Sequence, residues 1–182
     1  MKKLGVVFIL LSILSLISGC SYYSKGPWRG RVIDADTKKP IEGAAVVAVW
    51  QVGHPSIPEY RVEPYEAKET LTDKNGYYEI PKFSRITFAT NEIWDPTFTI
   101  FKPGYGRFPP SIGGVSKEAK GGKTPDGGLE FSLPKLESID DRWKNLSGLL
   151  IDGGSLDNAI PQFLKLKHEE ENILIQKKGE KK

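Results

Sequence analysis

Residues 44–52 have the sequence AAVVAVWQV, and this stretch decides the fold expected for the chain. Its β-branched and aromatic side chains favour an extended strand. A continuous apolar run of this length is typical of a strand that is buried on both faces or nearly so. The chain around it, from Trp28 onward, alternates short strand-like runs with turn residues. We therefore expect a mainly β domain built around this strand.

Six further strands are predicted on either side of it, at residues 29–34, 67–72, 77–80, 85–90, 96–101 and 129–133. The strongest local signal is Asn75-Gly76, because this dipeptide between two strand-like runs is typical of a hairpin turn. About seven short strands with turns between them favour an antiparallel sandwich. Residues 54–64 carry three prolines and residues 106–128 are rich in glycine, so both stretches are predicted to be loops.

The N-terminus carries a different pattern. Lys2 and Lys3 precede an apolar stretch at residues 4–17, and a run of small residues ends at Cys20. This order is typical of a secretory signal, and the apolar stretch is shorter than the ~20 residues of a membrane-spanning helix. The junction LISGC at residues 16–20 resembles the lipobox of bacterial lipoprotein precursors. In that family cleavage falls before the cysteine, and the cysteine carries the lipid.

Cys20 is the single cysteine of the chain. A lone exported cysteine pairs between molecules or stays a free thiol, and the resemblance adds lipidation as a third interpretation. An incidental cysteine in an ordinary signal peptide is the alternative. More than one acyl chain would anchor the protein firmly, at about 0.8 kcal/mol per buried methylene. The expected partner is therefore the lipid bilayer of the cell envelope. In an organism with two membranes, Ser21 in place of Asp implies the outer membrane.

Charge excludes one class of partner. Without Lys2 and Lys3 the chain holds 24 basic and 23 acidic residues, a formal net charge of +1. Nucleic acids and long anionic polymers need a large basic excess, so we expect neither as a partner. The length fits one domain with appendages. The expected division is a signal peptide at residues 1–19, a tether at 20–27, a sandwich at 28–136 and a helical extension at 137–182.

The two ends of the mature chain carry weaker signals. The tether contains Tyr22 and Tyr23, which either sit at the lipid headgroups, as amphipathic rings do, or belong to a disordered spacer. Residues 139–150 and 156–175 have helical spacing, and the lysine-rich residues 177–182 are expected to be disordered. Whether these helices dock on the sandwich or recruit a partner is left open by the sequence.

Three segments resemble a known domain family. GRVID at residues 30–34 and PIEGAAV at residues 40–46 resemble the opening of carboxypeptidase regulatory-like domains. TDKNGYYEI at residues 72–80 and FTIFKPGY at residues 98–105 resemble their later segments. The resemblance covers about residues 27–136 and implies a seven-stranded antiparallel transthyretin-like β-sandwich. In multidomain relatives this module is an accessory to a catalytic or transport domain, so here its partner would be a separate protein.

No catalytic constellation stands out in the sequence. His168 and Glu171 have the His-x-x-Glu spacing of zinc carboxypeptidases, but a catalytic zinc needs three protein ligands, so a charged solvent face is the better interpretation. Asp73 and Asn75 fit turn chemistry better than a calcium loop. No nucleophile motif and no phosphate loop is present. We therefore expect no enzyme activity, no cofactor and no metal.

Three aromatic residues are candidate ligand contacts: Trp94, Tyr105 and Phe108. Exposed aromatic rings stack on sugars or anchor protein interfaces, whereas packing over a sheet edge is the alternative for each of them. The leading hypothesis is a non-catalytic, membrane-tethered sandwich that supports or binds another envelope component. A glycan- or peptide-binding lipoprotein is the second hypothesis. A hydrolase whose acid or base lies in a cleft that no motif reveals is the third.

Overall fold

The computed structural model describes residues 20–88, 90–110, 119–125, 127–147, 149 and 155–179. This part of the chain is mainly β, with several sheets and a helical C-terminal part. The predicted signal peptide at residues 1–19 lies outside the described residues. The strands are β1 (Cys20–Lys25), β2 (Trp28–Asp34), β3 (Ala45–His54), β4 (Arg61–Leu71), β5 (Tyr77–Ile80), β6 (Phe83–Phe88), β7 (Glu92–Ile93), β8 (Thr97–Phe101), β9 (Lys120–Lys123) and β10 (Leu129–Leu133). The helices are α2 (Ile139–Ser147), the short 3-10 helix η1 (Asp157–Ala159) and α3 (Pro161–Gly179).

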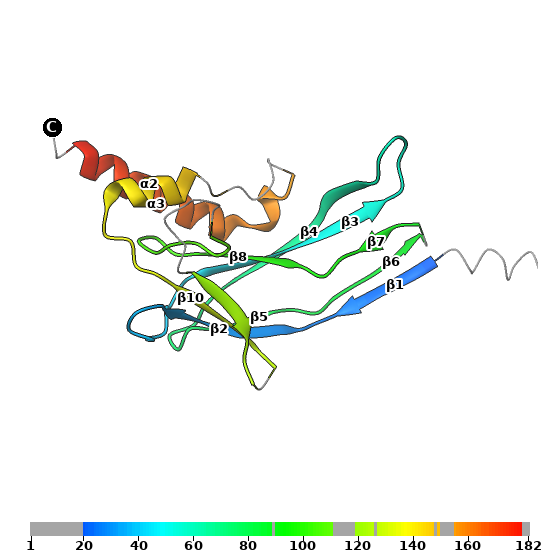
Figure 1. The fold of residues 1–182 in the computed structure, drawn as a ribbon, viewed down its shortest axis with the longest axis horizontal. Helices are drawn as coiled ribbons and strands as arrows, with labels where there is room; N and C mark the ends of the chain where they lie inside the picture. The colour runs from blue at the N-terminus through cyan, green and yellow to red at the C-terminus, as the bar shows by residue number, and fades with distance from the viewer. Residues whose placement is uncertain are drawn as a thin grey trace, which may run out of the picture.

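The strands form two larger sheets and a ribbon (Figure 1). The β2 sheet has the order β5-β2-β10-β9, and the β3 sheet places β3 between β4 on one side and β8 and β7 on the other. The β1–β6 ribbon is a separate antiparallel pair. The antiparallel arrangement predicted from sequence is wrong for one pair, since β2 and β10 are parallel. The whole β3 sheet lies between these two strands in sequence, so no hairpin turn constrains their relative direction.

The central strand is buried on both faces, as the apolar run at residues 44–52 predicts. Val46, Ala48 and Trp50 face a core shared with the β2 sheet, to which Val32 and Ile80 contribute. The alternate residues of β3 face the opposite way, because successive side chains of a strand point to opposite faces. They pack against the C-terminal helices, and they are Ala45, Val47 and Val49.

The C-terminal helices dock on the β3 sheet, which answers the question that the sequence left open. Figure 1 shows α2 and α3 above β8 and β3. The ring of Phe163 in α3 packs edge-on against Phe101 in β8, with ring centroids 5.9 Å apart. Glu69 in β4 accepts hydrogen bonds from the backbone N–H groups of Gln162 and Phe163, at 2.6 and 2.8 Å, and so caps α3. Strand and helix are therefore joined by both apolar and polar contacts.

Residues 20–25, which follow the predicted cleavage point, form a paired strand and not the disordered spacer that was one interpretation of the tether. Cys20 lies opposite Phe88 and Lys25 lies opposite Phe83, so β1 is paired along its whole length. Two predicted loops also contain strand residues. β4 begins at Arg61, inside the proline-bearing stretch, and β9 lies inside the glycine-rich stretch. In each case pairing with the neighbouring strand, β3 for β4 and β10 for β9, supplies the order that local composition does not indicate.

Candidate functional site

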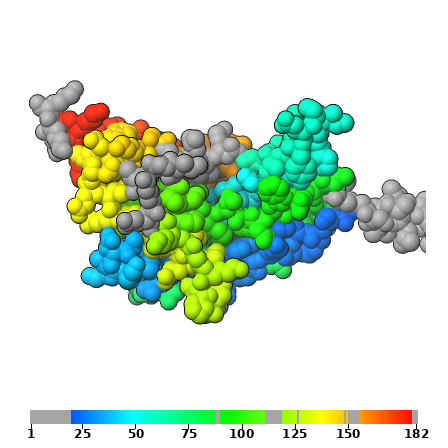
Figure 2. Space-filling model, in the orientation of Figure 1, coloured from blue at the N-terminus to red at the C-terminus, as the bar shows by residue number. Residues whose placement is uncertain are grey.

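Cys20 lies at one end of the ribbon, opposite Phe88. It is the first residue of β1, it is exposed, and its thiol is free. Figure 2 shows β1 toward one end of the long axis, with the C-terminal helix at the other end. A lipid on Cys20 would therefore attach at the end of the domain that is farthest from α3.

A polar network ties this ribbon to the core. The indole Nε1 of Trp50 donates a hydrogen bond to the phenol oxygen of Tyr23 at 3.2 Å, and Tyr23 donates to Asp95 at 3.1 Å. The ammonium group of Lys25 lies 2.6 Å from the Asp95 carboxylate. Burial raises the pKa of Tyr23 to about 12, while the hydrogen bond from Lys25 lowers the pKa of Asp95. The strand that begins at Cys20 is thus held to the domain by side chains as well as by its backbone.

The structure does not bring the three candidate contact residues together. Trp94 is 38% exposed and its backbone N–H donates to the carbonyl of Gln51. Tyr105 is half-buried against the core, where burial and the nearby Asp34 raise its pKa. The Phe108 ring packs against Phe131, with centroids 4.8 Å apart. Tyr105 and Phe108 are therefore partly buried against the core, and Trp94 is the exposed member of the set.

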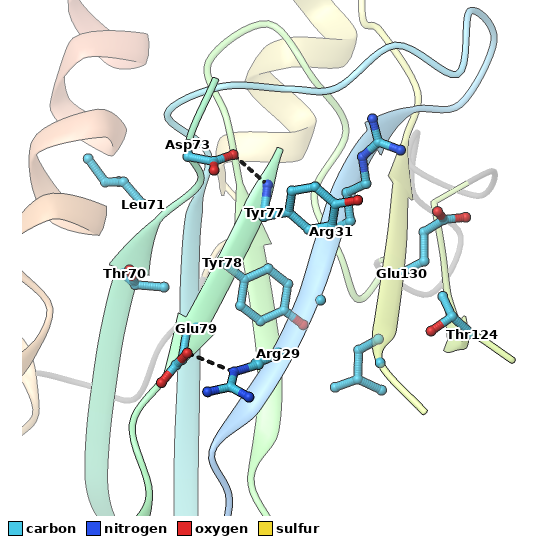
Figure 3. Close-up of a pocket in the computed structure, with 13 residues that line it drawn as sticks. Arg29, Arg31, Thr70, Leu71, Asp73, Tyr77, Tyr78, Glu79, Thr124 and Glu130 are labelled. Atoms are coloured by element: carbon cyan, nitrogen blue, oxygen red, sulfur yellow. Dashed lines mark hydrogen bonds and ion pairs between the residues drawn. The ribbon is translucent and has the colours of Figure 1, made fainter. Parts of the chain in front are cut away.

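A hollow of about 710 Å³ lies across β5, β2 and β10, between the end of β4 and the β9–β10 hairpin (Figure 3). Its polar groups are partly paired with one another. The Nε of Arg29 lies 2.7 Å from the Glu79 carboxylate. The guanidinium of Arg31 stacks over the exposed ring of Tyr77, 5.3 Å from its centroid, and donates to the carbonyl of Asn75. The hollow therefore presents an aromatic face beside fixed charges of both signs.

Two local features of the sequence shape this hollow. The Asp73 carboxylate accepts hydrogen bonds from the backbone N–H groups of Asn75 and Tyr77, both at 2.8 Å, and so fixes the turn into β5. At Gly30 a Cβ atom would overlap the carbonyl oxygen of Leu129, so glycine permits the close approach of β2 and β10. Sequence reasoning found the turn but missed the hollow, because its walls come from strands that are distant in the chain.

One wall contains a hydroxyl without a protein partner. Tyr78 is buried, and among the described residues its phenol oxygen has no hydrogen-bond partner. Burial raises the pKa of this phenol, so the group stays neutral. A neutral hydroxyl can both donate and accept, and it lies among the residues that line the hollow.

Within the described ranges, no group of three or more His, Cys, Asp or Glu residues is arranged to hold a metal ion. His168 lies 3.7 Å from Glu171 on the exposed side of α3, which fits the solvent face expected from the sequence. In the same part of the chain, no helix has the length and apolar character needed to cross a membrane.

Comparison with known proteins gives no match to a family model, a curated protein or a solved structure.

Proposed function

We propose that this chain is a lipid-anchored protein of the bacterial cell envelope whose β-domain is non-catalytic and supports or binds another envelope component. The observation that carries the proposal is Cys20. It is the single cysteine of the chain, it follows a positive, apolar and small-residue segment, and it is exposed at the start of the first strand. An enzyme that transfers a diacylglyceryl group to the sulfur needs such an accessible thiol.

The domain would then be a transthyretin-like sandwich of the carboxypeptidase regulatory-like type. Support comes from the seven strands predicted from sequence, each of which overlaps a strand of the structure. The two four-stranded sheets also contribute to one shared apolar core, as the layers of a sandwich do. β1, β7 and β9 would be additions to that seven-stranded plan.

The test of the anchor is the intact mass and membrane fractionation of the native protein beside a Cys20→Ala variant. We expect a mature native chain that begins at an acylated Cys20 and sediments with membranes. The Cys20→Ala variant should lack the added mass and leave the membrane fraction. A Ser21→Ala variant is the matched control and should behave like the native chain. A native chain that is soluble and unacylated would refute the anchor.

The accessory role has its own test. Crosslinking in intact envelopes followed by purification should recover a partner with the native chain and lose it with the mislocalised Cys20→Ala variant. Recovery of nothing above background from native envelopes would count against an accessory role while leaving the lipid anchor in place.

Ligand binding in the hollow is the second candidate function. The stacked Arg31 and Tyr77 favour it, because an exposed aromatic face beside charged groups suits sugar rings or peptides. On a glycan and peptide array, we expect binding that a Tyr77→Ala variant loses and a Trp94→Ala variant keeps. If Trp94→Ala loses ligand binding and Tyr77→Ala keeps it, the ligand contact is at Trp94 and not in the hollow. An array without binding to the native chain would remove this candidate.

A further inference from the structure

The β1–β6 ribbon has one face turned inward and one turned outward. Tyr23 and Phe83 lie on the inward face, where their rings pack 5.8 Å apart. Cys20 and Tyr22 alternate with Tyr23 along β1, so they lie on the outward face together with Ile86, the residue opposite Tyr22. The sequence alone does not reveal this face, because Ile86 belongs to a different strand.

The outward face is apolar close to Cys20. Tyr22 is 67% exposed and Ile86 is 69% exposed. They are direct cross-strand partners, so their side chains form one patch. The face becomes polar farther from Cys20, where the hydroxyls of Ser24 and Ser84 lie 2.9 Å apart. Hydrogen bonds from these two serines, and then the charge of Lys82, lower the pKa of Tyr22.

The pairing of β1 decides how far this patch can be from a lipid on Cys20. Tyr22 is two residues from Cys20, which in a strand is about 7 Å. The headgroup region on each side of a bilayer is of the same order, about 5–7 Å thick. Because β1 is paired with β6 from Cys20 onward, no slack chain separates the lipid from the patch. A disordered spacer would have allowed the domain to move away from the membrane.

We propose that the outward face of the ribbon, formed by Cys20, Tyr22 and Ile86, lies against the bilayer, with Tyr22 and Ile86 at the level of the headgroups. The change from apolar to polar along this face matches the change from acyl chains to water. Tyrosine is enriched at this level because its ring is apolar and its hydroxyl is polar. The inference depends on the lipid anchor proposed above, and it adds a second, non-covalent contact that orients the domain.

Ile57 supplies a matched control. It is 96% exposed, and it lies in the turn between β3 and β4. In Figure 1 the tip of the β3–β4 hairpin is at the upper right, apart from β1 at the lower right. Both positions are exposed isoleucines, so a difference between them reports on location and not on residue type.

The test uses the full-length chain, processed by its host and reconstituted in vesicles of phosphatidylethanolamine and phosphatidylglycerol. Transfer of a diacylglyceryl group from a phospholipid to Cys20 replaces the S–H bond with an S–C thioether bond and releases the phosphate headgroup and a proton. An added cysteine is then the single reactive thiol of the protein. Ile86→Cys and Ile57→Cys variants are labelled with an environment-sensitive fluorophore. Quenching is then measured with brominated acyl chains, which act in the lipid, and with iodide, which acts in water.

We expect one label per chain, with quenching by brominated lipid roughly twofold or more stronger at position 86 than at position 57. Iodide should quench the two positions in the reverse order. One label per chain with equal iodide quenching at both positions would overturn the inference and leave the anchor standing. A lipid-quenched label at position 57 with a water-exposed label at position 86 would also overturn it. Two labels on each chain of the host-processed cysteine variants would show that the Cys20 thiol is free. That result would refute the anchor and the inference together.

Discussion

Trp50 and Tyr23 are joined by a hydrogen bond of 3.2 Å from the indole Nε1 to the phenol oxygen. Trp50 is fully buried in the central strand β3, and Tyr23 lies in β1, three residues after Cys20. The two side chains therefore connect the core of the domain to the strand that begins at the proposed lipid site.

A Tyr23→Phe substitution tests this connection. It keeps the ring but leaves the buried indole N–H of Trp50 without its partner, which costs about 1–3 kcal/mol. We expect a loss of that size in the free energy of unfolding measured with urea. A Tyr22→Phe variant is the control, because the Tyr22 side chain is exposed and should change the free energy by less than about 0.5 kcal/mol. Equal effects of the two substitutions would contradict the structural role of Tyr23.

The raised pKa of Tyr23 predicts a loss of stability at alkaline pH. An unfolded chain ionises this phenol near its ordinary pKa of about 10. The folded chain holds it neutral up to a pKa of about 12. The neutral Tyr23 phenol therefore makes its full contribution to stability below pH 10. As the pH rises from 10 to 12 that contribution is lost, and the free energy of unfolding falls by at most about 2–3 kcal/mol. Unfolding free energies measured between pH 8 and pH 11 should fall, and the fall should be smaller in Tyr23→Phe.

A buried ion pair joins the two C-terminal helices. Glu170 in α3 accepts hydrogen bonds from Nε and an Nη of Arg142 in α2, at 2.7 and 2.5 Å, and both side chains are largely buried. Because Glu170→Gln leaves the Arg142 charge buried without a counter-charge, we expect a loss of about 3–5 kcal/mol. The neighbouring Glu171→Gln is the control and should have a small effect. Hydrogen exchange should show the loss of protection in α2 and α3, and unchanged protection there would contradict the prediction.

Docking of α3 on the β3 sheet depends on Phe163, which is almost fully buried against Phe101. Phe163→Ala should lower the free energy of unfolding by about 3–5 kcal/mol, since it removes a core ring and leaves a cavity. Ile175→Ala, on the exposed side of the same helix, should have little effect. Truncation after Leu136 without any loss of stability would show that the sheet does not need the helices.

Strands with strong local signals were predictable from sequence. β5 begins at Tyr77, directly after the Asn75-Gly76 turn, because the Asp73 carboxylate and the positive φ of Gly76 close that turn within a few residues. The two-sided burial of β3 followed from its continuous apolar run. In both cases the physical cause lies inside the segment itself.

Strands whose order comes from a partner strand and not from their own composition were not predictable in the same way. Residues 20–25 are polar on average. They are ordered because β6 supplies the backbone partners and because the indole N–H of Trp50 donates a hydrogen bond to Tyr23. β9 is the glycine- and lysine-rich KGGK segment, which pairs with β10. The hollow beside Tyr77 likewise combines residues of β4, β5, β2 and β10, which only the fold brings together.

By itself the sequence determined the expected location in the cell envelope, through Cys20 and the segment before it. It also determined the mainly β character of the domain, through its turns and apolar runs. Those features are local, and each is encoded by adjacent residues. The tertiary structure alone decided that β1 is a paired strand, that β2 and β10 are parallel, and that Tyr22 and Ile86 share one exposed face with Cys20. These depend on which strands meet across long stretches of chain, and that is set by the free energy of the whole packed domain and not by any one segment.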